Sequence, residues 1–149
     1  MAVVSQPGRA LGVDLGSVRI GLALSDPTRT VASPFEVVAR GADHEADHRA
    51  ILEIARANRV TTIVVGLPRS LSGAMGPAAR AAEKEINELR MAAGSDLEIV
   101  PHDERLTTVT AERALDEARV DRRTRKTVVD KIAAAVMLQS WLESHVSAR

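Results

Sequence analysis

The sequence predicts an α/β protein whose five-stranded mixed sheet has three antiparallel strands, then two parallel strands, with helices on both faces. Three apolar runs separated by short turns fill the first forty residues, as in an antiparallel meander. Beyond them, apolar runs alternate with amphipathic segments of helical period, which is typical of strands joined by crossover helices. Together the two observations describe a meander extended by two crossover strands.

The meander is expected at residues 10–15, 18–25 and 30–39. Segments 16–17 and 26–28 supply the turns between these strands, because glycine, serine, proline and aspartate favour tight turns. Turns this short join antiparallel strands, whereas a parallel pair needs a long crossover.

A helix is predicted over residues 43–58, where apolar side chains keep largely to one face. The β-branched residues 61–66 should form a buried strand. A second helix is expected over 77–93, with Pro77 in its first turn, where proline is well tolerated. Residues 97–100 make the fifth strand.

The last part of the chain is expected to hold two helices. Thr107 or Thr108 can cap a short helix that runs through Glu117, because a threonine hydroxyl can accept a bond from an amide of the first turn. The final helix should run over residues 126–144 and is nearly apolar all round, which indicates burial on several sides.

The chain of 149 residues fits one domain, expected at residues 10–145 behind a flexible N-terminal segment, residues 1–9. Cysteine is absent, which excludes disulfides and Cys-ligated zinc sites. No apolar stretch is long enough to span a bilayer, and the first nine residues lack the pattern of a secretory signal. We therefore expect a cytoplasmic protein with no membrane partner.

The net charge is zero, with 20 basic and 20 acidic side chains, so attraction to nucleic acid depends on how the charges are distributed. Only Asp121 opposes the densest basic run, which consists of Arg119, Arg122, Arg123, Arg125 and Lys126. Such a run is as readily a solvated connection between helices. With one Phe, one Trp and no Tyr, the chain has little for base stacking, so it would hold a nucleic acid through phosphates and shape.

Three carboxylates, Asp14, Glu104 and Asp130, lie in apolar surroundings, where an unpaired charge is costly. Each has an ordinary explanation alone: Asp14 can bond turn amides, Glu104 can pair with Arg105, and Asp130 suits a helix N-terminus. If the three meet, they indicate a site for a hard divalent cation, since such ions prefer oxygen ligands. Only one of Asp103 and Glu104 can join, because neighbours on a strand point to opposite faces.

The segment from His44 to His48 matches H-E-x-x-H, a pattern in which two histidines bind zinc and the glutamate serves as a base. The neighbouring Asp43 and Asp47 indicate a solvated first turn, and no third ligand follows at a suitable spacing. We therefore expect an ordinary surface helix here. His102 is interpreted as a loop histidine.

Four segments resemble the signature blocks of the YqgF family, also called RuvX: residues 12–26, 65–68, 103–108 and 130–139. The D-E-R-x-T-T and D-x-x-A-A-x-x-x-L-Q patterns of the last two blocks are the specific ones, and the similarity extends over residues 10–142. It implies an RNase H-like fold, shared with Holliday-junction resolvases of the RuvC type. It also implies a nuclease that acts on structured nucleic acid, with maturation of the 5′ end of pre-16S ribosomal RNA as the usual role.

The resemblance assigns the catalytic and metal-binding roles to Asp14, Glu104 and Asp130, with Mg²⁺ or Mn²⁺ as the cofactor. The cations expected to hold the phosphates of the nucleic acid are Arg19, Arg69, Arg105, Arg119, Arg122, Arg123, Arg125 and Lys126. The basic run is foremost among them, because it leads directly into Asp130.

Three alternatives stay open at this point. The substrate can be a four-way DNA junction, whose symmetric cleavage calls for two active sites and hence a homodimer. The chain can instead be a non-catalytic ribosome-assembly factor that keeps the acidic patch. The third is an ATP-binding module, because the glycines after Asp14 also resemble the phosphate loop of actin-like folds, although those folds need two lobes.

Overall fold

The computed structural model describes residues 8–68, 76–103 and 122–146, and within the last range the side chains of residues 128–145. The short helix expected to run through Glu117 lies outside these residues. No helix that the structure describes is long and apolar enough to cross a membrane.

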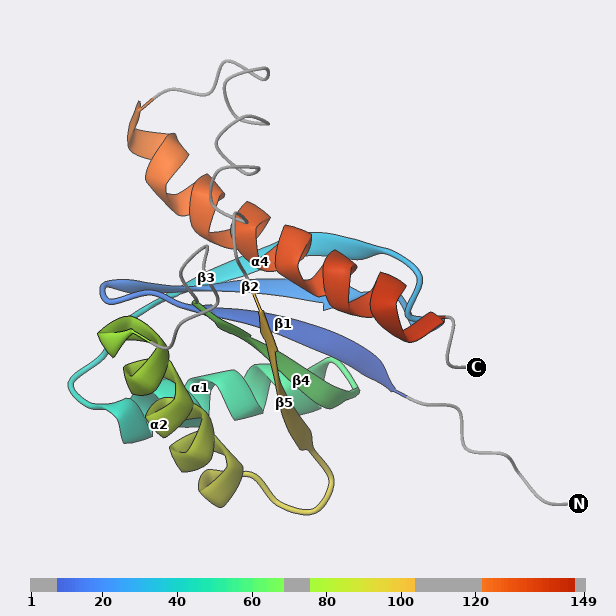
Figure 1. The fold of residues 1–149 in the computed structure, drawn as a ribbon, viewed down its shortest axis with the longest axis horizontal. Coiled ribbons are helices and arrows are strands. Elements are labelled where there is room, and N and C mark those ends of the chain that lie inside the picture. The colour runs from blue at the N-terminus through green and yellow to red at the C-terminus, as the bar shows by residue number, and fades with distance from the viewer. Residues whose placement is uncertain (1–7, 69–75, 104–121, 147–149) are drawn as a thin grey trace, which may run out of the picture.

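One mixed sheet of five strands organises the protein (Figure 1), in the order β3-β2-β1-β4-β5. The antiparallel meander consists of β1 (Arg9–Leu15), β2 (Arg19–Ser25) and β3 (Ala32–Ala39). The parallel strands are β4 (Val60–Leu67), which pairs with β1, and β5 (Glu98–Asp103), which pairs with β4. The predicted combination of three antiparallel and two parallel strands is confirmed.

Helices cover both faces of the sheet (Figure 1): α1 (His44–Ala57) and α2 (Pro77–Ala92) lie on one face, and α4 (Arg122–Val146) lies on the other. The carboxylate of Asp43 accepts a bond from the amide of Ala46 at 2.8 Å and so caps the start of α1. The helices α1 and α2 and the five strands all lie within a few residues of the bounds predicted from the sequence.

The start of the last helix differs from the prediction. It begins at Arg122, whereas the sequence pattern placed its start at residue 126. Arg122, Arg123, Arg125 and Lys126 thus belong to the first turns of α4 and not to a connection before it. Arginine and lysine are good helix formers, so a basic run extends a helix as readily as it ends one.

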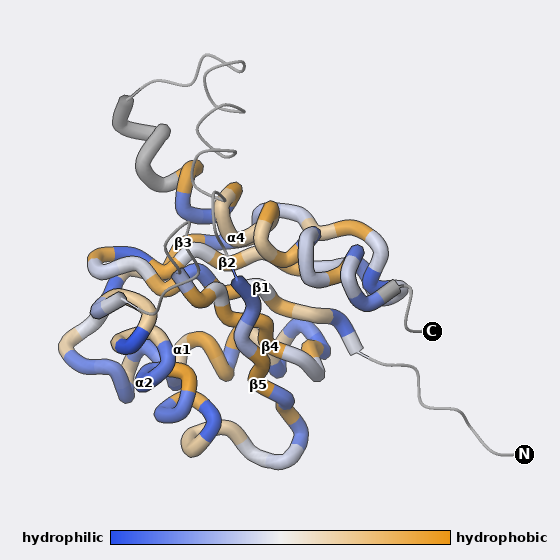
Figure 2. Tube along the Cα trace, in the orientation of Figure 1, coloured by the Kyte–Doolittle hydropathy of each residue, from blue (hydrophilic) through white to orange (hydrophobic). Residues whose placement is uncertain are grey.

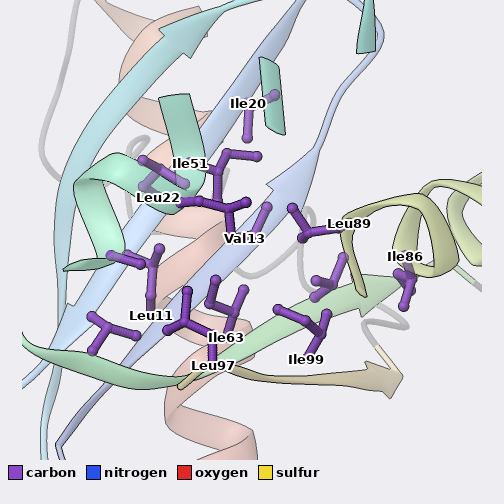
Figure 3. Packing of buried hydrophobic residues seen from close by; sticks show 14 of the residues in the cluster. Leu11, Val13, Ile20, Leu22, Ile51, Ile63, Ile86, Leu89, Leu97 and Ile99 are labelled. Carbon is purple, nitrogen blue, oxygen red and sulfur yellow. The ribbon is translucent and has the colours of Figure 1, made fainter. Parts of the chain in front are cut away.

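Two apolar layers hold the sheet between the helices. The larger one joins α1 and α2 to the sheet, and Figure 3 shows Leu11, Val13 and Ile63 of the central strands packed among its side chains. The smaller layer lies under α4, where Met137 and Leu138 are fully buried against the sheet. Figure 2 shows that hydrophobic residues predominate along the central strands β1 and β4. This is expected, because helices bury both faces of these strands.

The helix α4 approaches the ribbon of β1 and β2 unusually closely because both strands present glycine to it. A Cβ atom added to Gly12 would lie 2.8 Å from the Cβ of Leu138, and one added to Gly21 would lie 2.1 Å from the carbonyl oxygen of Asp130. Real Cβ atoms essentially never approach another heavy atom so closely, so neither position accepts a side chain while α4 stays in place.

We expect Gly21→Ala to lower the free energy of unfolding by about 1–3 kcal/mol, because the new methyl group must push the backbone of α4 away from the sheet. Urea denaturation of the wild type and the variant measures the difference. Gly76→Ala is the matched control, since a Cβ there meets no atom within 4 Å. Its cost should stay below that of Gly21→Ala, and equal costs would contradict the close contact.

Candidate active site

Asp14 lies on the face of the sheet that α4 covers. Side chains alternate along β1, and Ala10 and Gly12 both face α4, so the next residue in this series is Asp14. In the pairing of β1 with β2, Asp14 lies directly opposite Gly21. Paired residues of neighbouring strands share a face, so Asp14 and the missing side chain of Gly21 point to the same side.

Asp130 of α4 comes down onto this same place. Its backbone carbonyl occupies the space that a side chain at Gly21 would fill. The helix therefore enters the gap beside Asp14, and the structure brings two of the three predicted carboxylates to one end of one face of the sheet. Glu104, the third, lies outside the described residues.

Arg19 connects β2 to this position. Its Nε donates a 2.7 Å hydrogen bond to Oδ2 of Asp130, with 33% of the arginine side chain and 25% of the aspartate side chain exposed. Arg19 is one of the residues predicted to hold phosphates, and it lies beside a candidate catalytic carboxylate. A guanidinium has five N–H donors, so this bond leaves most of its capacity for other acceptors.

The other predicted phosphate contacts are distributed as follows. Arg69, Arg105 and Arg119 lie outside the described residues. Arg122, Arg123, Arg125 and Lys126 precede Asp130 on the same helix, within its first turns.

Asp103 lies on the opposite face from the two carboxylates. It ends β5 in register with Leu67, which is packed into the core beneath α1 and α2. His102, one residue earlier, faces α4, and its Nε2 lies 3.1 Å from the hydroxyl of Ser140. Burial lowers the pKa of His102, against the opposing charge of Asp103. The interpretation of His102 as a loop histidine is wrong, because β5 continues through it.

The turn that follows Asp14 is held from the other side of the sheet by Arg40. Its Nε donates to the carbonyl of Gly16 at 2.9 Å. The two terminal nitrogens donate to both carboxylate oxygens of Glu85, at 2.6 and 3.0 Å, and one of them also donates to Asp47 at 3.1 Å. One guanidinium thus links the turn to both helices of that layer.

This network was not predicted from the sequence, although α2 carries a signal for it. Glu85 has the helical spacing of Ala82 and Leu89, which both belong to the buried face of α2. A glutamate on an apolar face requires a partner, because an unpaired buried charge is costly. The periodicity could have marked Glu85, but its partner Arg40 is distant in the sequence.

The H-E-x-x-H segment is not the solvated surface turn that was expected. Asp47 and His48 are both buried, at 4% and 3% exposure, and Nε2 of His48 lies 2.9 Å from Oε2 of Glu85. Two bonds to Asp47, from Arg40 and from the amide of Gly41, compensate its burial. Within the described residues, His44, His48 and Glu85 also form a group that could hold a metal ion.

Electrostatics favour the charged forms of this network. Burial alone would raise the pKa of Glu85, but hydrogen bonds from Arg40 and His48 outweigh it and lower the pKa. For Asp47, burial is likewise outweighed by the bonds from Gly41 and Arg40, and its pKa is lowered. The bonds to Glu85 raise the pKa of Arg40, so the pairs stay ionised at neutral pH.

Two hollows lie at opposite ends of the sheet. One, of about 590 Å³, is lined by Gly16 and Ser17 of the turn and by Arg40, His44 and Glu85 of the network. The larger, of about 910 Å³, lies around the first residues of β1 and β4, far along the strands from Asp14. Neither of these two hollows includes Asp14 or Asp130 among its described lining residues.

We expect Glu85→Gln to cost about 3 kcal/mol at pH 7, because it removes the charge that balances the buried Arg40. The pKa of Glu85 in the folded protein is below its ordinary value of 4.5, so its contribution to stability is complete above pH 4.5 and is lost as the pH falls through the lowered value. Urea denaturation between pH 7 and pH 3 measures both effects.

The variant should therefore lose less stability on acidification than the wild type. Glu45→Gln is the matched control, because Glu45 is exposed on α1 and should change stability by less than about 0.5 kcal/mol. Parallel pH profiles of the wild type and Glu85→Gln would contradict the assignment.

Comparisons with known proteins identify the family of this chain. The family described as "RuvX: Holliday junction resolvase" matches residues 8–144. A protein of Mycobacteroides abscessus is 45% identical over 139 residues, which cover 91% of this chain and 81% of the relative. One from Roseiflexus sp. is 41% identical over 140 residues, covering 94% and 97%. Both carry the name "putative pre-16S rRNA nuclease".

Solved structures show the same fold. RuvC of Thermus thermophilus in complex with a Holliday junction substrate superposes with a TM-score of 0.58 and 14% identity, covering 94% of this chain and 96% of RuvC. At this identity the likeness concerns the fold alone, which is RNase H-like.

Proposed function

This chain belongs to the RuvX family and is a nuclease, and we propose that it matures the 5′ end of pre-16S ribosomal RNA with divalent cations bound by Asp14, Glu104 and Asp130. The observation that carries the proposal is the arrival of Asp130 beside Asp14 across Gly21. Carboxylates brought close together repel each other, and bound divalent cations reverse that penalty.

The residues present fit Mg²⁺ or Mn²⁺. Asp14 and Asp130 offer only oxygen, which these hard ions prefer, and Mg²⁺ needs few protein ligands because water and substrate phosphates complete its shell. When bound, the cation would supply positive charge to the scissile phosphate and acidify a water molecule. Asp103 faces the other side of the sheet, which supports Glu104 as the third ligand.

The chain's own cations have separate roles in this proposal. Arg19 of β2 holds the carboxylate of Asp130 through Oδ2. Its remaining donors serve a phosphate oxygen of the substrate. The basic first turns of α4 precede Asp130 on the same helix. A nucleic acid whose phosphates are bound by these turns would therefore extend past the carboxylates of Asp130 and Asp14.

Pre-16S RNA is the favoured substrate because relatives that are 38–45% identical carry that name. This substrate agrees with the expected cytoplasmic location and requires a single active site. The second candidate is a four-way DNA junction, which the description of the family favours. Symmetric cleavage of a junction would require a homodimer.

We expect Asp14→Asn to reduce cleavage of a pre-16S transcript by more than the ~10–100-fold that loss of an outer-shell partner costs, because the amide removes a ligand charge. Binding of the transcript, measured by fluorescence anisotropy, should stay within a few-fold of wild type. Cleavage assays with Mg²⁺ and with Mn²⁺ test the metal, and a synthetic four-way junction tests the second substrate.

Asp103→Asn is the matched control for this experiment, since it removes a carboxylate from the same region but from the opposite face. It should cleave as wild type does, whereas Glu104→Gln should resemble Asp14→Asn. Undiminished cleavage by Asp14→Asn would refute the proposed site. If the protein cleaves the junction but not the transcript, and light scattering shows that it is a dimer, then DNA and not RNA is the substrate.

The basic turns of α4 generate a prediction about salt. A plot of the logarithm of the binding constant for the nucleic acid against the logarithm of the salt concentration has a negative slope. Replacing Arg122 and Arg123 by alanine should reduce the magnitude of this slope by about 1.4–1.8, because each phosphate contact contributes about 0.7–0.9. The control removes two exposed cations from the other layer, Arg49 and Arg80, and should leave the slope unchanged. An unchanged slope in the first variant would show that α4 does not hold the phosphates.

A further inference from the structure

We propose that His44, His48 and Glu85 form a second metal site, which binds a zinc-class transition ion and joins α1 to α2. The two histidines lie one helical turn apart on α1, and Glu85 projects from α2. Each residue offers one ligand atom, and these atoms lie within 4.8 Å of one another. Two imidazoles and one carboxylate form a ligand set that suits Zn²⁺ and not Mg²⁺.

The buried pair already has nearly the spacing that a bound ion requires. Nε2 of His48 lies 2.9 Å from Oε2 of Glu85. Ligand atoms of a tetrahedral zinc site with bonds of about 2.0–2.1 Å are about 3.3 Å apart, so an adjustment of a few tenths of an ångström suffices. The ion would replace the proton that now joins the two side chains.

Two of the three ligands, Glu85 and His44, also have an outer partner that orients them. Arg40 holds both carboxylate oxygens of Glu85. Nδ1 of His44 lies 3.2 Å from Oε1 of Glu88, the arrangement in which a carboxylate orients a ligating imidazole. Such outer partners are typical of metal sites.

The charges of the cluster leave room for a dication. Asp47, Glu85 and Glu88 are carboxylates, and among the described residues of the cluster Arg40 is the cation that faces Asp47 and Glu85. With neutral imidazoles, as metal ligands must be, this set carries two negative charges. One divalent ion balances them, whereas further protonation of the histidines would be needed to do the same without metal.

An ion can reach the site from solvent. The side chain of His44 is 55% exposed and lines the hollow of about 590 Å³ beside the turn. His48 and Glu85 lie behind it with little exposure. The exposed side chain of His44 can thus move onto an ion that His48 and Glu85 have already bound, and so bring its ligand atom closer to theirs.

The site is a binding site and not a zinc protease centre. In the H-E-x-x-H pattern the glutamate serves as base beside the metal. Here Glu45 is exposed and pairs with Arg49 at 3.4 Å, outside the ligand group. The third ligand comes from α2, so the metal would act by holding the two helices together.

Titration of the metal-stripped full chain with Zn²⁺, against a chromophoric chelator, tests the proposal. The wild type should bind one Zn²⁺ at this site, and saturation should raise the Tm by about 5 °C or more. His44→Gln should weaken this binding at least about 10-fold and abolish the rise in Tm. This variant is decisive, because His44 is half exposed and its loss leaves the buried pairs of Arg40 intact.

Two further variants separate this site from other zinc ligands. His145→Gln removes a histidine from the far end of α4 and should bind Zn²⁺ as wild type does. Asp14→Asn should keep the zinc-dependent rise in Tm even though it loses cleavage, so the two proposals can fail independently. Equal affinity and equal Tm shifts in the wild type and His44→Gln would overturn the metal site, as would the absence of saturable binding in the wild type.

Discussion

The close approach of α4 to the ribbon of β1 and β2 is the constraint on which the candidate active site depends. Gly12 and Gly21 leave no side chain between strand and helix, so the backbone of Asp130 reaches the sheet beside Asp14. Glycine within a strand costs about 0.5–1 kcal/mol relative to alanine. Burial of Met137 and Leu138 under the same helix offsets that cost and holds α4 in place.

Asp14 is fixed from the opposite side of the sheet as well. The turn that follows it is bonded through the carbonyl of Gly16 to Arg40, whose guanidinium is anchored by Glu85 and Asp47. Ion pairs with this degree of burial add little net stability over apolar packing, but they are costly to break. Their value here lies in geometry, because one side chain ties the turn to α1 and α2 at once.

The sequence predicted those parts of the fold that depend on local pattern. Periodicity placed α1 and the strands correctly, because an amphipathic segment must bury its apolar face whatever the partner. It could not pair Arg40 with Glu85, since that contact depends on how β3 and α2 meet. His48 was judged by its charged neighbours and proved buried, because on a helix the residues one turn away, not the adjacent ones, share its surroundings.

The two sides of the turn between β1 and β2 differ in donor chemistry. On the side of α4, the described ligands are the carboxylates of Asp14 and Asp130, which suit hard ions that retain water and accept substrate phosphates. On the side of α1 and α2, imidazoles dominate, and zinc-class ions bind imidazole more strongly than Mg²⁺ does. The sheet lies between α4 on one face and α1 and α2 on the other, so it separates these two ligand sets. A metal held by the histidines would therefore stabilise the scaffold behind Asp14 without competing for the ions of the nuclease.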